Sequence, residues 1–245
     1  MARYSLHGGH NSIVQGANYG NRKEHIMDRQ VKDAVVAKLR ALGHTVYDDT
    51  DEVGTTQAQN LNNIVSKTNS HDVDLVVSFH LNSYDTKANG VEVLYYDQQA
   101  LSAKIAAQLS KDIGWSNRGA KERKDLYVLS NTKAPAILIE LGFIDNEADM
   151  AKWNPDKIAN SIVYALTGQS GETTPPSKQN IIQSGAFSPY EVPEAMQALN
   201  SVKMTAKFIL QPDGLTYFIS DPTSDDQLNG MKGWLDRKGW WYEVK

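Results

Sequence analysis

Two hydrophobic patterns alternate along the first 168 residues of the chain. One is a near-continuous apolar run such as Leu75–His80, which is typical of a strand buried on both faces of a sheet. The other is helical spacing, as in Val31, Val35, Leu39 and Leu42, followed by glycine. Alternating strands and helices predict an α/β domain with a mostly parallel sheet sandwiched by helices.

Each pattern occurs several times. The strands expected from it are Arg3–Leu6, Thr45–Tyr47, Leu75–His80, Val91–Tyr96 and Ala136–Leu141. The helices expected from it are Glu24–Leu42, Gln57–Thr68, Leu101–Ile113 and Pro155–Leu166.

A stretch without apolar residues, GQSGETTPPSKQ at Gly168–Gln179, separates this region from the rest of the chain. Its adjacent prolines favour extended, helix-breaking backbone. The sequence therefore predicts a domain over residues 1–168, a linker over 169–180 and a small α+β module over 181–245.

The C-terminal module has six predicted elements in the order strand, helix, strand, strand, helix, strand. They are Asn180–Gln183, Pro193–Asn200, Lys203–Leu210, Leu215–Ser220, Asp225–Lys238 and Trp240–Val244. The turn Pro212-Asp213-Gly214 makes the two middle strands a hairpin. This order is that of the ferredoxin-type split β-α-β motif.

Composition excludes several classes of protein. The chain is 40% hydrophobic and 22% charged, as in ordinary globular proteins, and it has no cysteine, which rules out disulfides and thiolate metal sites. A net charge of −4 without a basic cluster argues against nucleic acid as a partner.

No apolar run approaches the roughly 18 residues of a membrane span, and the N-terminus lacks the apolar core of a secretory signal. We therefore expect no membrane insertion, synthesis in the cytoplasm, and action outside only after release.

Three residues are candidate metal ligands: His10 in GGHNS, Glu24 in NRKEH and His80 in SFHLNS. Without cysteine, a hydrolytic zinc ion has to be held by imidazole and carboxylate. Two histidines and one glutamate form a catalytic set that leaves a fourth position for water. Each residue also has an ordinary explanation, because a histidine is common in polar loops and a carboxylate is favoured at a helix N-terminus.

Glu140 follows the apolar run Ala136–Ile139, where a carboxylate is costly unless it is paired or used. Burial raises the pKa of such a carboxylate toward the working pH, as a general base requires. The alternative is that the side chain turns outward into solvent. We place His80 and Glu140 at the C-terminal ends of their strands, where functional groups of parallel sheets collect.

These motifs in this order, with ILIELGFIDN around Glu140, resemble the amidase-3 family of zinc N-acetylmuramoyl-L-alanine amidases, found in phage endolysins and bacterial autolysins. The resemblance covers about residues 1–167. It implies that His10, Glu24 and His80 hold one Zn²⁺ per chain and that Glu140 is the catalytic acid/base. It also implies cleavage of the amide bond between N-acetylmuramic acid and L-alanine of the peptidoglycan stem. Many members have aspartate three positions before the first ligand, where this chain has His7, so the surroundings of His10 are expected to differ.

Other residues are candidates for contacting the cell wall. Asn82 and the basic residues Arg118 and Lys121 are predicted to orient the substrate, whose stem carries carboxylates, although charged residues here are also explained by simple solvation. The tail over about residues 181–245 resembles the wall-binding module of endolysins from Bacillus anthracis–cereus group phages, which implies a wall carbohydrate of such hosts as a partner. Its candidate binding residues are Trp240, Trp241 and Tyr242.

Alternation in the last strand predicts that one of Trp240 and Trp241 is buried and the other exposed. The small module would also gain from a dimer that covers this strand. A phage lysis enzyme would reach the wall through holin-type escape or lysis. Two alternatives to the amidase remain open: a zinc peptidase that cuts within the stem peptide, and a wall-binding protein without catalysis.

Overall fold

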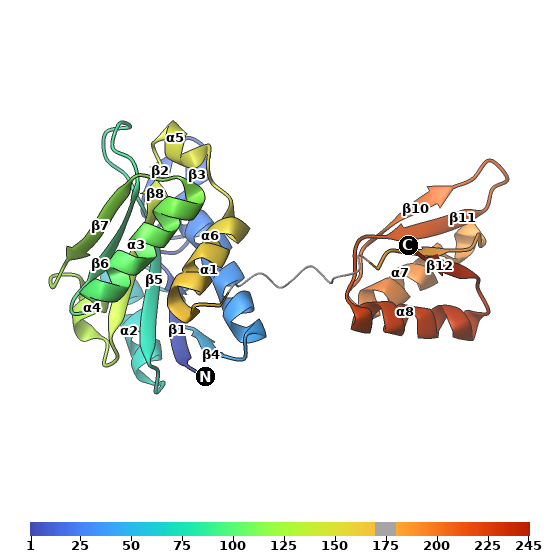
Figure 1. Cartoon of the computed structure of the whole chain (residues 1–245), viewed down its shortest axis with the longest axis horizontal. Coiled ribbons are helices and arrows are strands. Elements are labelled where there is room, and N and C mark those ends of the chain that lie inside the picture. Colours follow the sequence, from blue (N-terminus) through green and yellow to red (C-terminus); the bar gives the residue numbers. More distant parts are fainter. Residues whose placement is uncertain (170–179) are drawn as a thin grey trace. The chain divides into compact units, whose positions relative to one another are not determined.

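The computed structural model describes residues 1–169 and 180–245, which belong to two compact units (Figure 1). The predicted linker, 169–180, lies almost wholly outside the described residues, so the domain boundaries remain predictions. Among the described residues, no helix combines the length and apolar character needed to cross a bilayer.

The first unit is built on a six-stranded sheet in the order β4-β1-β5-β8-β6-β7. Neighbouring strands are parallel except β6 and β8, which are antiparallel. The strands are β1 (Arg3–Gly8), β4 (Thr45–Asp48), β5 (Leu75–Asn82), β6 (Val91–Tyr95), β7 (Asn117–Glu122) and β8 (Ala136–Phe143). The predicted α/β class with a mostly parallel sheet is confirmed.

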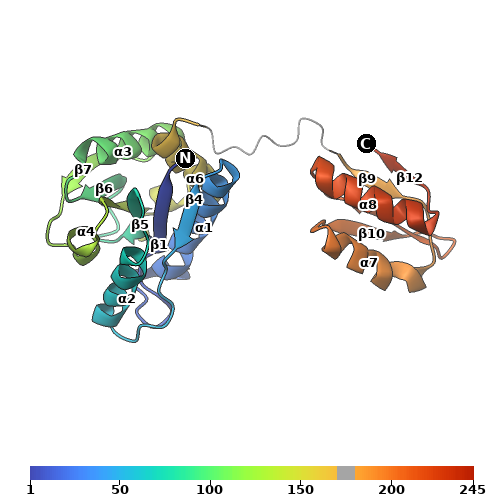
Figure 2. The same cartoon turned by 90° about the horizontal axis from the view of Figure 1, so that it is seen from below.

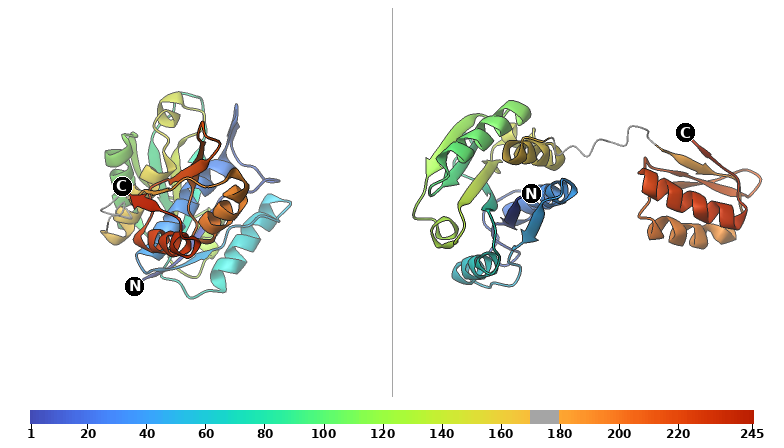
Figure 3. Two further views of the ribbon diagram at one scale, coloured as in Figure 1. Left: turned by 90° about the vertical axis from the view of Figure 1, so that its right-hand side faces the viewer. Right: turned by 60° about the horizontal axis from the view of Figure 1, so that its bottom comes forward.

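Helices cover both faces of this sheet (Figures 2 and 3). On one face, α1 (Glu24–Ala41), α3 (Gln99–Ile113) and α6 (Pro155–Thr167) bury the larger apolar core. On the other, α2 (Gln57–Asn69) and α4 (Tyr127–Asn131) bury a smaller one. A short hairpin of β2 (Asn18–Tyr19) and β3 (Arg22–Lys23) precedes α1, and α5 (Glu147–Met150) precedes α6.

The central strands are longer than their sequence predicts. β5 and β8 stay paired to Asn82 and Phe143, with a register shift after His80. The placement of His80 and Glu140 at strand ends was therefore wrong. These residues are paired neighbours within the strands, because the backbone hydrogen bonds continue past them through a bulge.

The structure has a strand that the sequence does not predict, and this strand carries Arg118 and Lys121. Residues Asn117–Glu122 form β7, which pairs with β6 at the edge of the sheet. An edge strand is largely exposed and often carries charges that prevent pairing with other chains. Its polar sequence therefore lacks the apolar alternation that identifies a strand.

The second unit is a four-stranded antiparallel sheet in the order β10-β11-β9-β12, with its helices on one face. Its elements are β9 (Ile182–Ser184), the 3₁₀ turn η1 (Pro189–Glu191), α7 (Val192–Ser201), β10 (Ala206–Leu210), β11 (Thr216–Ser220), α8 (Asp225–Lys238) and β12 (Tyr242–Val244). The predicted split β-α-β order and the central hairpin are confirmed. β10 begins later than expected because Lys203 has a left-handed backbone, with φ of 55°.

Candidate functional site

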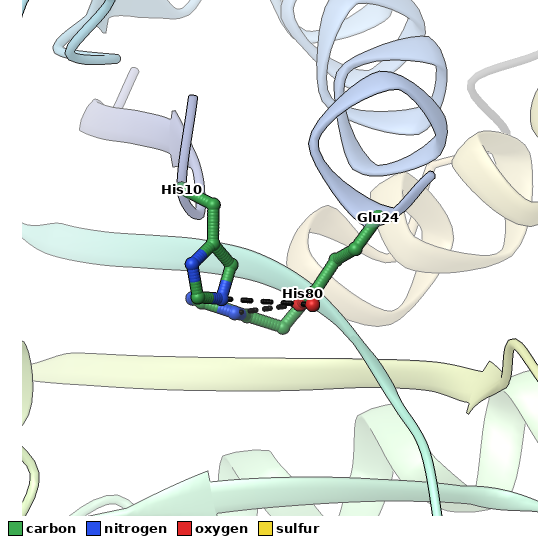
Figure 4. A group of neighbouring side chains, drawn as sticks. All are labelled: His10, Glu24 and His80. Atoms are coloured by element: carbon green, nitrogen blue, oxygen red, sulfur yellow. Dashed lines mark hydrogen bonds and ion pairs between the residues drawn. The ribbon is translucent and has the colours of Figure 1, made fainter. Parts of the chain in front are cut away.

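The three candidate ligands come together at one point of the first unit (Figure 4). His10 lies in the loop after β1, Glu24 is the first residue of α1, and His80 lies in β5. One ligand atom from each side chain lies within 4.8 Å of the others. The three residues that the sequence singled out are therefore neighbours, and neither His7 nor His25 belongs to the group; the role of His10, Glu24 and His80 as metal ligands remains a prediction.

The Glu24 carboxylate is held by hydrogen bonds on both oxygens. Its Oε1 lies 3.0 Å from His80 Nδ1 and accepts the backbone N–H of Leu81 at 3.1 Å. Its Oε2 accepts the N–H of Ala17 at 2.7 Å and lies 3.6 Å from His10 Nε2. His10 Nε2 and His80 Nδ1 therefore both face the carboxylate.

The electrostatics of the group favour a positive charge where the three side chains meet. Burial alone would lower the pKa of His80, but its hydrogen bond to Glu24 and the charges of Glu24 and Glu140 raise that pKa to about 9. Burial and the charge of His80 lower the pKa of His10 to about 4. Burial opposes ionisation of Glu24, but the hydrogen bond to His80, the charges of both histidines and the backbone N–H of Ala17 together outweigh burial and lower the pKa of Glu24. Glu24 thus remains an anion that attracts a cation.

The geometry fits a zinc ion. Tetrahedral zinc with bonds of about 2.0–2.1 Å to nitrogen and oxygen places its ligand atoms about 3.3 Å apart. The separation of 3.0 Å from His80 to Oε1 of Glu24 and that of 3.6 Å from His10 to Oε2 lie on either side of that value. Two imidazoles and one carboxylate are also a zinc donor set that leaves a position open for water or substrate.

Two glycines make room for these ligands. A Cβ atom on Gly9 would lie 2.1 Å from Cε1 of His80, and one on Gly16 would lie 2.4 Å from Oε2 of Glu24. Gly16 also has φ of 72°. These distances are far below van der Waals contact, so any side chain at either position would displace a ligand.

Arg29, which the sequence interpretation missed, holds the loop that carries His10. Its guanidinium donates to the carbonyl of Gly9 at 3.0 Å and to the carbonyl of His10 at 2.9 Å, and it pairs with Glu52 at 2.8 Å. His10 has φ of 56°, a left-handed conformation that persists only where its surroundings impose it. The planar fork of an arginine suits this double contact.

Glu140 lies beside His80, to which it is paired in the β5–β8 register. Its Oε2 atom is buried and has no hydrogen-bond partner among the described residues. Burial raises the pKa of Glu140 to about 7, and the charges of Glu24 and Glu92 act in the same direction, whereas that of His80 opposes them. The Oε2 atom is therefore shielded from solvent although Glu140 as a whole is half-buried, and the pKa of its carboxyl group is suited to proton transfer near neutral pH.

Asn82 and Arg118 contact a residue that the sequence interpretation did not single out. Asn82 donates to Glu92 Oε1 at 3.1 Å, and Arg118 donates to Glu92 Oε2 at 2.8 Å while lying 5.0 Å from the ring centre of Phe143. Glu92 is the register partner of Glu140. The carboxylate of Glu92 is therefore paired with Arg118 next to Glu140. The substrate role predicted for Asn82, Arg118 and the exposed Lys121 remains a prediction.

A cavity of about 350 Å³ opens beside the ligands. His10, His80 and Glu140 line it at the ligand end, and Arg123 and Asp125 also line it. The other walls of the cavity are apolar and are formed by strand and helix residues: Leu61, Ile64, Leu94, Val128 and Leu138. Asn82, Arg118 and Lys121 are not among its lining residues.

In the second unit the two neighbouring tryptophans differ in exposure as predicted, but both precede β12, so alternation within that strand is not the cause. Trp241 is 63% exposed, whereas Trp240 packs on the core and stacks on Phe187, with ring centres 4.3 Å apart and planes 14° apart. Tyr242 is half-buried against the same core.

Comparison with known proteins identifies both units. Residues 6–168 match the Amidase_3 family, N-acetylmuramoyl-L-alanine amidase, and residues 201–244 match the PlyG cell wall binding domain family. A solution structure of the PlyG cell wall binding domain is 78% identical to this chain over 30% of its length and 86% of that chain. Its TM-score is 0.27, so the match to the family carries the assignment of the second unit.

Relatives of the first unit agree with its family. The catalytic domain of the CD27L endolysin that targets Clostridia difficile is 27% identical with a TM-score of 0.63, covering 69% of this chain and 99% of that one. The germination-specific N-acetylmuramoyl-L-alanine amidase of Bacillus subtilis is 30% identical, covering 45% of this chain and 50% of the relative. The chain spans about half the length of several curated relatives. Since the family match covers more than half of the chain and includes all three candidate ligands, the chain belongs to the Amidase_3 family of N-acetylmuramoyl-L-alanine amidases and carries a PlyG-type cell wall binding domain.

Proposed function

We propose that this protein is a zinc-dependent peptidoglycan hydrolase that cleaves the amide bond between N-acetylmuramic acid and L-alanine and acts in bacterial cell lysis. The observation that carries the proposal is the meeting of His10, Glu24 and His80 beside the half-buried Glu140, in a chain of this family. Each of these groups is needed for amide hydrolysis, and all of them lie in the first unit.

The residues of the site have two roles, metal binding and proton transfer. His10, Glu24 and His80 would hold one zinc ion, which when bound would polarise the scissile carbonyl and lower the pKa of a water molecule at the open position. Glu140 accepts the proton of the attacking water on its carboxylate and passes it to the leaving amine of L-alanine. Its buried position raises its pKa enough for it to act in both directions.

The residues around Glu140 support that role. Asn82 and Arg118 hold Glu92 beside it, so their contribution to substrate orientation is expected to be indirect. Lys121 is exposed on the edge strand β7 and is the remaining basic candidate for contacting a stem carboxylate.

The second unit would bind a carbohydrate of the cell wall, in hosts of the Bacillus cereus group. The family match over residues 201–244 supports wall binding, and the exposed ring of Trp241 supports carbohydrate as the ligand, since sugars stack on aromatic faces. Trp240 and Tyr242 contribute by fixing the last strand, since both pack on the core. β12 is the outer strand of its sheet, which leaves an edge for pairing with a second copy. The protein would act on the wall after holin-type escape or lysis.

Mass spectrometry of fragments from digested Bacillus peptidoglycan tests the activity. An amidase releases stem peptides with a free L-alanine amine and leaves a lactyl carboxylate on the muramic acid. A peptidase would instead open bonds between amino acids of the stem, and a wall-binding protein without catalysis would release nothing. Either of the last two results would contradict the proposal.

A further inference from the structure

Two buried polar side chains at the cavity beside the metal ligands have no role in the proposed reaction. His7 on β1 and Ser78 on β5 are register partners and are 0% and 1% exposed. Both ring nitrogens of His7 and the hydroxyl of Ser78 lack hydrogen-bond partners among the described residues. A buried donor or acceptor without a partner is destabilising, so a ligand that bonds to both groups would be favoured.

Both side chains line the same cavity as His10, His80 and Glu140. Ser78 precedes His80 by two residues in β5, so their side chains are on the same face of the sheet, about 6.6 Å apart along the strand. A substrate whose carbonyl lies at the ligands therefore has its neighbouring groups within reach of Ser78 and His7.

The chemistry of the cavity selects a neutral ligand. Burial lowers the pKa of His7 to about 3, so its imidazole is uncharged near neutral pH and offers one donor and one acceptor. The cationic Arg123 is already bound through two hydrogen bonds of 2.8 Å to Asp125. A carboxylate would meet no free cation among these lining residues and would lie near Glu140.

The remaining walls are apolar. Leu61, Ile64, Leu94, Val128 and Leu138 line the cavity between the sheet and the helices α2 and α4. A ligand that fits these surroundings has a donor and an acceptor for His7 and Ser78 and a small apolar group for the walls.

We propose that this cavity is a substrate subsite that binds a neutral secondary amide carrying a methyl group, with His7 and Ser78 as its hydrogen-bonding partners. The inference rests on the proposed amidase function, because the substrate then supplies such a group on each side of the scissile bond. One is the acetamido group on C2 of the muramic acid, next to the C3 carbon that bears the lactyl group. The other is the L-alanine methyl with the peptide bond that follows it.

The test measures kcat/KM of the full chain on three substrates. The reference is N-acetylmuramoyl-L-alanyl-D-isoglutamine. One analogue has a hydroxyl in place of the acetamido group, and the other has an ester oxygen in place of the peptide N–H that follows L-alanine. For the wild-type protein, kcat/KM on the reference is expected to exceed kcat/KM on one of the analogues, the one that lacks the amide bound by His7 and Ser78, by about tenfold or more.

Ser78→Ala removes one hydrogen-bonding group with little change of shape. It is expected to reduce that preference about threefold to tenfold. His7→Leu, which replaces the ring by an apolar side chain, is expected to reduce it further. Ser102→Ala is the matched control: Ser102 is also fully buried with an unpartnered hydroxyl, but it lies on α3 and does not line the cavity. Zinc content and thermal unfolding show that each variant is folded.

The outcomes are distinct. A reduced preference in the acetamido arm assigns the subsite to the sugar, and a reduced preference in the ester arm assigns it to the peptide bond that follows L-alanine. If wild type cuts the reference bond and Ser78→Ala keeps the wild-type preference in both arms, the subsite is overturned while the amidase function stands. If wild type releases no L-alanine amine at all, the proposed function fails and the subsite with it.

Discussion

The two units of this chain differ in whether their buried polar side chains have hydrogen-bond partners. Among the described residues, every buried side-chain nitrogen or oxygen without a hydrogen-bond partner belongs to the first unit. In the second unit, the buried side chains of Ser184 and Ser220 accept backbone N–H groups of Phe218 and Ile182, both at 3.0 Å. Its candidate binding residue, Trp241, is instead at the surface.

This difference follows from what each unit has to do. A reactive carboxyl group such as Glu140 needs a buried, incompletely bonded environment to raise its pKa, and such groups cluster at active sites. A wall-binding unit needs only a rigid scaffold and an exposed surface. Unpartnered groups are not sufficient evidence of function, since Ser102 is one of them and lies away from the cavity. The gathering of His7, Ser78 and Glu140 at one cavity is what distinguishes the first unit.

The largest expected effect is the loss of the metal. Exhaustive chelation should abolish release of L-alanine amines, because three side chains converge on a cation site and no protein group can replace it. Added Zn²⁺ should restore the activity, and metal analysis should give one zinc per chain. Binding of the isolated second unit to cell walls should be unaffected by the chelator. Full activity with a verified metal content of nil would rule out zinc dependence.

Substitution of the buried base is expected to have the next largest effect. Glu140→Gln preserves shape but cannot accept a proton, so turnover should fall by about 10²–10⁴-fold while zinc remains bound. The wild-type rate should fall as the pH falls through about 7, because the carboxylate acts as a base only when ionised and its pKa is about 7. The variant should lack that pH dependence.

The exposed Glu122 on β7 provides a control for the loss of a carboxylate. It pairs with Lys124 at the surface, so Glu122→Gln should keep the wild-type rate and the wild-type pH profile. Wild-type turnover by Glu140→Gln would mean that another residue is the base.

Much of the fold could be predicted from the sequence because burial imposes a pattern. The apolar run around Val77 and Phe79 and the helical spacing of α1 gave the class, and α8 was predicted with its observed bounds. β7 could not be predicted, because an edge strand has no continuous buried face to mark its period. The extension of β5 and β8 past His80 and Glu140 depends on pairing between distant segments, which local pattern does not contain.

The site could be predicted only as far as its chemistry is local. His10, Glu24 and His80 stand out by residue type and by motif. Arg29 and Glu92 do not, because ordinary charged residues gain their roles from contacts made 19 and 26 residues away in the chain. The need for Gly16 likewise appears only once Glu24 and His10 occupy the space around it.

Separating the units should divide the two activities. We expect residues 1–168 to fold and to cut purified peptidoglycan, since every ligand and Glu140 lie there. On whole cells the same piece should lose efficiency, about tenfold or more, because tethering raises the local substrate concentration only at a surface.

The complementary piece, 181–245 fused to a fluorescent protein, should label Bacillus cells and not an unrelated Gram-positive host. Equal labelling of both hosts, or of neither, would remove the targeting role of the second unit. An inactive 1–168 piece that is nevertheless folded and zinc-loaded would show that catalysis needs both units.

The smallest expected effect distinguishes recognition from scaffold within the second unit itself. Trp241→Ala should weaken binding of the 181–245 fusion to Bacillus walls by about tenfold to thirtyfold, as for an aromatic residue central to an interface. Its thermal unfolding should barely change, because the ring is 63% exposed.

Trp240→Ala should instead lower stability. It removes the ring stacked on Phe187 and should cost about 2–3 kcal/mol of stability, and wall binding should be lost only as the unit unfolds. Tyr190→Ala provides the control for exposure alone, since Tyr190 is 95% exposed on η1 and should affect neither property. If Trp241→Ala bound walls like wild type while Tyr190→Ala did not, the binding surface would lie near η1 instead of the last strand.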